Sequence, residues 1–370
     1  MQPRSALLVA VLVTLAGGCT PPASSGTPAD LPPIAFQRTL ADGTQALSNL
    51  DRQISRLEPL AEQPVIASVL VGARLTRTQF AGHYSGFAHA LNEAPDRQTR
   101  ADVLAALHRF DEALAEAPSE EVEHKVQLAR TQDLDALLDL RLDSVDARPS
   151  PSNWMNLAVV HSARGEYVDA DYAYWEALLL YRDVSPLFVA QAQFQRGVMW
   201  GERADDPERA RALYEDAVRI LPGYVVANVH LAELEFEAGE VDSAVTRLQR
   251  MADRSQDPEP FSRLAQYAED PSAAQVAQDR YEALLLEHRL AFADHAVEFF
   301  LGPGDAPERA WRLAQDNFRN RPTDRARRLA IEAALASGRQ DQACSLIYKA
   351  ADPVESSLIE VIEAEQPNCP

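Results

Sequence analysis

Alanine recurs along the chain from residue 170 onward at nearly constant intervals. The recurring positions are Ala170, Ala210, Ala244, Ala277, Ala310 and Ala343, spaced 40, 34, 33, 33 and 33 residues apart. Apolar residues between them fall at three- and four-residue spacing, which is typical of helices, and alternating β-branched runs are absent. A fixed period of this length predicts one helical unit repeated along the chain and stacked on its neighbours. The longer first interval predicts an insertion near residues 183–187.

Residues 154–177 show what one unit contains. A large residue, a Leu–small pair, a turn glycine and an Ala–aromatic–Ala series occur at Trp154, Leu157, Ala158, Gly165, Tyr167, Ala170, Tyr174 and Ala177. This pattern resembles the tetratricopeptide repeat, a hairpin of two helices with a period of ~34 residues. We expect Ala158 and Ala170 to lie where the two helices cross, because larger residues would force the helices apart. Trp154, Leu157 and Tyr174 would fill the space around that contact.

The resemblance covers most of the chain unevenly. It is good over 151–352 and loose over 64–150. We expect a helical N-terminal region with divergent repeats over 38–150, and a C-terminal cap or tail over 353–370. The resemblance therefore implies an all-α fold, an α-α superhelix of tetratricopeptide-type hairpins.

Within the divergent region, three local patterns stand out. We expect a capping helix over 42–60 and a hairpin over 63–92 that turns around Gly82. Ala106, Phe110 and Ala113 keep the pattern of a second helix.

The first twenty residues have the layout of an export signal. Arg4 precedes the apolar run 6–15, and small residues follow. The apolar run is too short to span ~30 Å of hydrocarbon comfortably, so a permanent transmembrane helix is the weaker interpretation.

The end of this signal resembles the lipobox of bacterial lipoproteins, in the sequence Leu15-Ala16-Gly17-Gly18-Cys19. The alternative is an ordinary signal cleaved near Gly18, with Cys19 incidental. The lipobox resemblance implies a signal peptide over 1–18, lipidation of Cys19, and a flexible Pro/Ser-rich tether over 19–37. It also implies attachment to the cell envelope on the periplasmic face of the outer membrane, because Thr20 rather than Asp follows the cysteine.

The charge balance excludes several partners. The chain has 56 acidic and 35 basic side chains, a formal net charge of −21. It therefore lacks the basic surface that nucleic acids or anionic lipids require, and the membrane would be reached through the lipid anchor alone.

Catalytic and cofactor-binding motifs are not visible in the sequence. None of the eight histidines has the HExxH spacing, and no CxxC pair or GxSxG motif occurs. We therefore expect no catalytic residue, no cofactor and no metal. Asp294, His295 and Glu298 lie together on one helix and could hold a divalent ion, but a polar groove surface is the favoured interpretation.

If Cys19 is lipidated, two cysteines remain for an oxidising compartment. Cys344 lies on the second helix of the last repeat, and Cys369 is the penultimate residue. We predict a disulfide between them, which would hold the C-terminal tail over the end of the array.

Stacked hairpins curve, and in this family the first helices line a concave groove that takes a peptide or a partner helix. By that resemblance the groove-facing positions are Met155, Val159, Gln195, Met199, Arg203, Val229, Glu233, Phe236, Glu237, Gln266, His295, Phe299 and Glu332. Because the groove and the chain are acidic, a basic or amphipathic protein partner is favoured.

The sequence therefore predicts a non-enzymatic scaffold, anchored by lipid, that binds other envelope proteins. In layout it resembles repeat lipoproteins that assemble outer-membrane proteins, pili or secretins. The alternatives are a metal-dependent or enzymatic periplasmic protein with its site in the groove, and a passive spacer.

Overall fold

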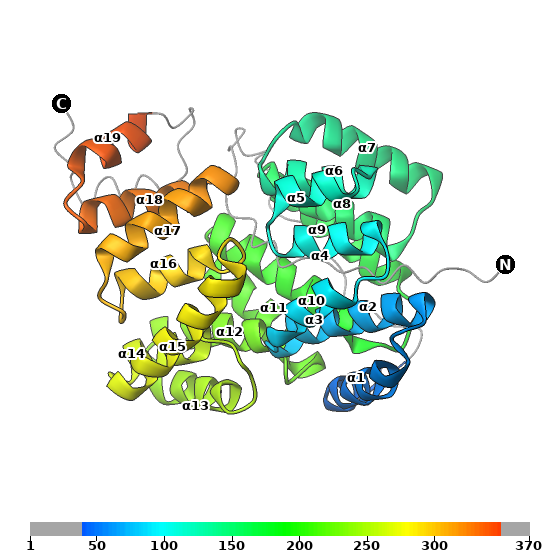
Figure 1. The fold of residues 1–370 in the computed structure, drawn as a ribbon, viewed down its shortest axis with the longest axis horizontal. Helices are drawn as coiled ribbons and strands as arrows, with labels where there is room; N and C mark the ends of the chain where they lie inside the picture. The colour runs from blue at the N-terminus through cyan, green and yellow to red at the C-terminus, as the bar shows by residue number, and fades with distance from the viewer. Residues whose placement is uncertain (1–38, 349–370) are drawn as a thin grey trace.

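The computed structural model describes residues 39–348. Within these residues the chain forms nineteen α-helices, one 3-10 helix and one π-helix, and no strand. The predicted all-α fold is confirmed. Figure 1 shows the helices following one another as antiparallel pairs along a curved path, so that the chain forms a superhelix of hairpins.

The N-terminal region carries the first seven α-helices. They are α1 (Gly43–Leu57), followed by η1 (Glu58–Leu60), then α2 (Pro64–Ala81), α3 (Ser85–Glu93), α4 (Arg97–Ala106), α5 (Phe110–Glu116), α6 (Glu120–Ala129) and α7 (Leu134–Ala147). The predicted capping helix corresponds to α1 with η1, and the predicted hairpin to α2 and α3. Gly82 makes the turn with a φ of 63°, which a side chain would disfavour.

One pattern in this region was assigned wrongly. Ala106, Phe110 and Ala113 do not share one second helix, because the chain leaves α4 after Ala106 and re-enters a helix at Phe110. Between them His108 adopts a φ of 55°. That left-handed conformation ends α4, and the apolar spacing alone did not reveal the break.

The regular array follows from α8. Its helices are α8 (Pro151–Ala163), α9 (Tyr167–Leu180), α10 (Pro186–Val198) with η2 (Met199–Arg203), α11 (Pro207–Ile220), α12 (Val225–Glu237), α13 (Val241–Ala252), α14 (Glu259–Tyr267), α15 (Pro271–His288), α16 (Ala293–Leu301), α17 (Pro307–Asn320), α18 (Asp324–Ala336) and α19 (Gln340–Tyr348). The recurring alanines lie on the second helices α9, α11, α13, α15, α17 and α19, and all are fully buried. The repeat frame read from the sequence is therefore confirmed.

The close crossing inside one hairpin also has the expected residues. Ala158 on α8 and Ala170 on α9 are fully buried, and Leu157 and Tyr174 are buried in the same core cluster. Trp154 packs against that cluster while partly exposed. Small residues at the crossing allow the two backbones to approach, and the large ones fill the flanking space.

The insertion in the first interval lies elsewhere than predicted. The loop between α9 and α10 is short, whereas the first helix of this hairpin is extended by η2, a five-residue π-helix over Met199–Arg203. The prediction of an insertion near residues 183–187 is therefore largely wrong. A π-turn adds residues without interrupting the helical hydrophobic pattern, so the sequence gives little sign of it.

Helix starts and hairpin turns follow local rules. Four array helices begin after a capping Ser or Asp that is followed by Pro, at Ser150, Ser185, Asp206 and Asp270. The turn between first and second helices is made by Gly165, Gly239 and Gly338, each with a positive φ. Asp205 and Glu269 adopt positive φ at corresponding turns without being glycine.

The N-terminal helices pack back onto the middle and the C-terminal half of the array. Phe80 on α2 makes an edge contact with Tyr224 at 4.8 Å, and the Gln256 amide donates to the Gly82 carbonyl at 3.0 Å. The Tyr84 hydroxyl donates to Asp257 at 2.7 Å. The helix α2 contacts α12, and Figure 1 shows both near the centre of the molecule. The hairpin α2–α3 therefore covers the loop that leads into α14.

Several predictions fall outside the described residues. These are the signal peptide 1–18, Cys19, the tether 19–37, the tail 353–370 and Cys369. Among the helices over 39–348, none combines the length and the apolar composition needed to cross a bilayer.

Candidate partner-binding surface

Six charged side chains form a closed ring of ion pairs, which we call the inner ring. Its members, in order, are Glu202, His230, Glu233, Arg263, Glu298 and Arg325. The nitrogen–oxygen distances around the ring are 3.3, 3.3, 2.6, 3.5, 2.5 and 3.4 Å. The side chains come from η2, α12, α14, α16 and α18, the first-helix positions of five consecutive hairpins. The inner ring therefore marks the inner surface of the array.

The charges in the inner ring stabilise one another. Burial opposes ionisation of Glu233, but the Arg263 charge and the His230 hydrogen bond outweigh it and hold the pKa of Glu233 well below its usual range. Burial disfavours the charged form of His230, yet Glu233 and Glu202 raise its pKa. The Glu233 charge raises the pKa of Arg263 in turn. Opposite charges this close remain ionised although they are largely removed from water.

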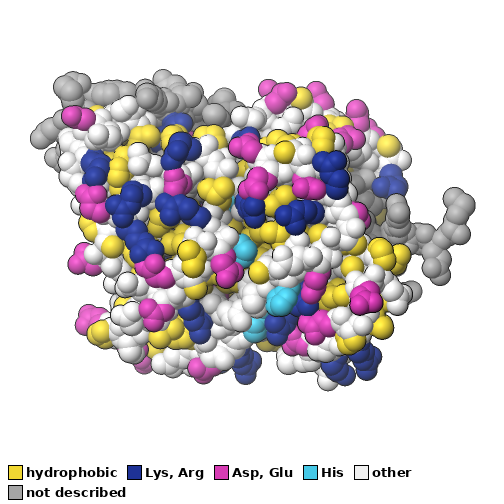
Figure 2. Space-filling view, viewed as in Figure 1, with side chains coloured by type: hydrophobic (Ala, Val, Ile, Leu, Met, Phe, Trp, Pro, Cys, Tyr) yellow, Lys and Arg dark blue, Asp and Glu magenta, His cyan; other side chains and the backbone are white. Residues whose placement is uncertain are grey.

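The inner ring is still open to contact from solvent. The exposed fractions of its side chains lie between 9% and 25%. Figure 2 shows Lys and Arg side chains gathered over α16–α18 with acidic groups among them, and histidines near the centre. The inner ring itself is not purely acidic, because Arg263, Arg325 and His230 pair with its three carboxylates. A partner segment with both signs of charge fits this surface better than a purely basic one.

A second group of charges lies next to the inner ring. His295 Nδ1 lies 3.2 Å from Glu259, and Arg321 donates to Asp294 at 2.7 Å. Burial opposes the charge on His295, but Glu259 and Asp294 raise its pKa to about 10. The same pairing overcomes burial of Glu259 and lowers its pKa to about 2.

The residues predicted as possible metal ligands lie here, but the structure groups Glu259, rather than Asp294, with His295 and Glu298. Potential ligand atoms of Glu259, His295 and Glu298 lie within 4.8 Å of one another, whereas Asp294 is paired with Arg321. Arg263 and Arg325 both contact the Glu298 carboxylate. Two guanidinium groups and a protonated histidine repel a divalent cation, so this geometry favours an ion-pair cluster over a metal centre.

An aromatic stack adjoins the inner ring. Phe236 on α12 and Tyr267 on α14 are parallel, with ring centroids 3.8 Å apart. Glu237 and Gln266 beside them are exposed. Burial and the nearby Glu233 charge raise the pKa of Glu237, which has no opposite charge within ion-pair distance among the described residues. These four residues offer both apolar and polar contacts to a partner.

The predicted groove positions fall into two groups. Met155, Met199, Val229 and Phe299 are buried in hydrophobic clusters and lack the surface that a partner contact needs. Their apolar side chains pack between hairpins, because the first helix of each hairpin must bury a face against its neighbours. The remaining positions keep partial or full exposure: Val159, Gln195, Arg203, Glu233, Phe236, Glu237, Gln266, His295 and Glu332.

The sequence prediction missed members of the inner ring. Glu202, His230, Arg263 and Arg325 were not among the predicted groove positions. The sequence feature that could have revealed them is a charged or titratable residue on the first helix of each successive hairpin. Glu202 was harder to find because it lies on the π-helix, which shifts the frame.

The structure describes one of the two cysteines of the predicted disulfide. Cys344 lies on α19, is buried, and takes part in a disulfide bond. Cys369 lies outside the described residues, so the pairing stays a prediction.

A protein-family comparison bears on this surface. A family model described as Tetratricopeptide repeat matches residues 203–267, which hold three members of the inner ring. The chain carries a tetratricopeptide repeat. No curated protein matches the sequence.

Solved structures give similar architectures at low identity. The chain is similar to a chain of the APC/C hetero-tetramer Cut9-Hcn1, with 14% identity, 80% of this chain and 62% of that chain covered, and a TM-score of 0.43. It is similar to yeast Tom70, with 14% identity, 88% and 93% covered, and a TM-score of 0.36. It is also similar to a tetratricopeptide repeat protein from Parabacteroides merdae, with 12% identity, 85% and 99% covered, and a TM-score of 0.34. The chain spans less than two thirds of the Cut9-Hcn1 chain.

Proposed function

We propose that this protein is a non-enzymatic scaffold that binds other proteins or peptides on the inner surface of its helical array. The observation that carries the proposal is the inner ring, which places partly exposed charges from five consecutive hairpins on one surface. Repeat arrays bind partners on such surfaces through contacts spread over many hairpins. The stacked Phe236 and Tyr267 extend the surface with apolar area.

The partner is a segment that carries charges of both signs and some apolar side chains. Its basic groups would meet exposed carboxylates such as Glu237, and its acidic groups would compete for the ring arginines. The net charge of −21 further favours a partner that is basic overall, because long-range attraction speeds encounter.

The proposed location is the bacterial cell envelope. The sequence around Cys19 supports a lipid anchor, and the tether over 19–37 would hold the folded array away from the bilayer. Envelope partners follow from that location, and an assembly factor for outer-membrane proteins, pili or secretins is one specific form of it.

Partner capture tests the binding surface. Envelope proteins are crosslinked to the chain in cells, and partners recovered with the unmodified chain are compared with those of Glu237→Arg. The matched control is Asp279→Arg, a charge reversal on the outer helix α15. The proposal predicts that Glu237→Arg loses partners that Asp279→Arg keeps. Equal recovery by both variants would place binding elsewhere.

The anchor is tested independently. A fatty-acid probe should label the chain in cells, and Cys19→Ser should abolish the label. Labelling that persists in Cys19→Ser would contradict the anchor without affecting the binding surface.

A further inference from the structure

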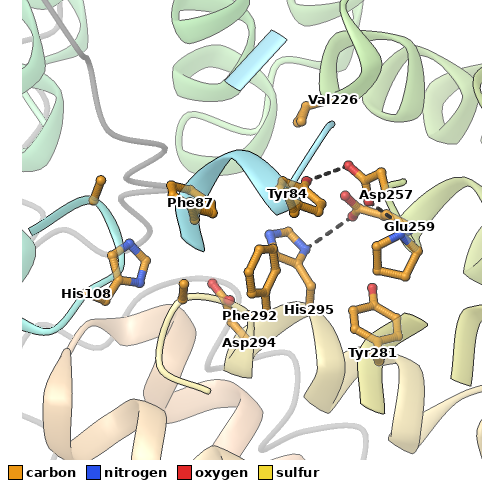
Figure 3. A pocket seen from close by; sticks show the side chains of 13 residues that line it. Tyr84, Phe87, His108, Val226, Asp257, Glu259, Tyr281, Phe292, Asp294 and His295 are labelled. Atoms are coloured by element: carbon orange, nitrogen blue, oxygen red, sulfur yellow. Dashed lines mark hydrogen bonds and ion pairs between the residues drawn. The ribbon is translucent and has the colours of Figure 1, made fainter. Parts of the chain in front are cut away.

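A cavity lies where the hairpin α2–α3 meets the array. Its volume is about 50 Å³, and with the space open to solvent it reaches about 590 Å³. Tyr84 and Phe87 of the hairpin α2–α3 line one side, and residues between the end of α13 and the start of α16 line most of the other. The end of α4 and the start of α12 also contribute. Figure 3 shows side chains from both walls facing each other across the cavity.

The carboxylate of Asp257 borders this cavity without a paired cation. Asp257 is 2% exposed. It accepts hydrogen bonds from the Tyr84 hydroxyl at 2.7 Å and from the Glu259 amide at 2.9 Å. No Lys, Arg or His nitrogen of the described residues lies within 4.0 Å of it. Arg280, which is close, donates instead to the backbone carbonyls of Ser255 and Asp257.

The other carboxylates of the cavity are neutralised. Glu259 pairs with His295 at 3.2 Å, and Asp294 pairs with Arg321 at 2.7 Å. Figure 3 shows the Glu259–His295 and Tyr84–Asp257 contacts side by side. Asp257 is therefore the one carboxylate lining the cavity whose charge no described cation balances at contact distance. A buried unbalanced charge is costly, and a bound cation would relieve that cost.

Aromatic rings supply the remaining surface. Tyr84 and Phe292 meet edge to face with centroids 4.7 Å apart, and Phe87 lies 6.4 Å from Phe292. Tyr281 lines the cavity close to Glu259 and Asp257; burial raises the pKa of its hydroxyl, and the charges of these two carboxylates raise it further. Ring faces attract a desolvated cation and accommodate a short alkyl stem.

We propose that this cavity binds a primary ammonium group, with the Asp257 carboxylate as its counter-ion and the aromatic rings around its alkyl stem. An ammonium group has three donors, which suit the carboxylate oxygens and the Tyr84 hydroxyl oxygen. A divalent metal fits less well, because it prefers several oxygen ligands and aromatic walls offer none. Together with the space open to solvent, about 590 Å³, the cavity has room for a small head group and the adjoining stem.

The ammonium group comes from a free alkylamine or from a lysine side chain of a partner. The proposal does not depend on the scaffold function, because a free amine suffices to occupy the cavity. Since the walls belong to the hairpin α2–α3 and to the array, occupancy would also hold these two parts together.

Ligand titration of the full chain tests the proposal. At pH 7.5, n-propylammonium chloride should raise the melting temperature in a saturable way, whereas equal concentrations of n-propanol or sodium chloride should not. Asp257→Asn should weaken binding at least tenfold. Asp253→Asn, which removes an exposed charge on the same segment, should change the dissociation constant less than twofold. Phe292→Leu keeps the carboxylate but removes a ring, and should weaken binding about fivefold.

The outcomes are distinct. No saturable shift in the unmodified chain, or an equal shift in Asp257→Asn with its fold intact by circular dichroism, would overturn the proposal. Competition with propylammonium by Nα-acetyl-lysine amide, whose side-chain ammonium group is free, indicates a partner lysine as the source. Binding of propylammonium without that competition indicates a free amine.

Discussion

The Arg325 guanidinium on α18 lies 3.4 Å from the Glu202 carboxylate on η2, although 123 residues separate them. The same guanidinium contacts Glu298, so one side chain joins three hairpins. This contact closes the inner ring and shows how tightly the array curves. The inner surface is consequently a compact patch of balanced charge rather than a long acidic groove.

Removing Arg325 should destabilise the array strongly. Arg325→Met leaves Glu298 and Glu202 without this cation, in a site where the Arg325 side chain is only 13% exposed. We expect the free energy of unfolding to fall by about 2–4 kcal/mol, measured by urea denaturation. A double-mutant cycle with Glu298→Gln should give a coupling energy above about 1 kcal/mol.

The matched control for this prediction is Arg319→Met. Arg319 pairs with Asp316 but its side chain is 75% exposed, so its loss should cost less than about 1 kcal/mol. If Arg325→Met costs no more than Arg319→Met, the inner ring contributes nothing particular to the fold.

The charge on Asp257 should make stability depend on pH. Burial and the Glu259 charge raise the pKa of Asp257 to about 6, above its usual 3.8. The folded state therefore favours the protonated carboxyl, and this contribution is complete below about pH 4 and lost as the pH rises through 6. Asp257→Asn removes the charge, and its Nδ2 can donate to the Tyr84 oxygen.

Asp257→Asn should consequently be more stable than the unmodified chain at pH 8, by about 1–3 kcal/mol in urea denaturation. The difference should narrow as the pH falls to 5. Asp253→Asn should show neither effect. A difference that is constant from pH 8 to 5 would show that Asp257 does not titrate in this range.

The hairpin turns allow a paired test of backbone strain. Glu269 has a φ of 49° at the turn between α14 and α15, where Gly239 has a φ of 80° between α12 and α13. Glu269→Gly should raise the free energy of unfolding by up to about 1 kcal/mol, because glycine tolerates this conformation. Gly239→Ala should lower it by about 1 kcal/mol; nothing lies within 4 Å of an added Cβ there, so strain alone is measured. If the free energy of unfolding changed in the same direction in both variants, backbone strain at these turns would not explain the changes.

The sequence predicted the repeat frame well because that frame rests on local constraints. Ala170 and its equivalents must be small wherever two helices of a hairpin cross, and Gly165 must turn with a positive φ. These requirements recur in every unit, so they are visible without any knowledge of the assembled molecule.

The surface was harder to predict because it depends on how hairpins stack. Met199 and Phe299 have the spacing of groove positions but are buried between hairpins. Arg325 and Glu202 meet only because of the curvature of the array, which no single unit encodes. The contact between Tyr84 and Asp257 likewise joins segments 173 residues apart. Only the assembled structure could place these pairs.

Site-specific photo-crosslinking in cells tests the central claim most directly. A photoreactive residue is placed at Glu237 on the inner surface, at the exposed Gln266 beside it, or at Leu286 on the outer helix α15, which is 88% exposed. All three positions are accessible, so any difference reflects where a partner binds. The scaffold account predicts discrete protein adducts from Glu237 and Gln266 and none from Leu286. Adducts from Leu286 with none from the inner positions would contradict it.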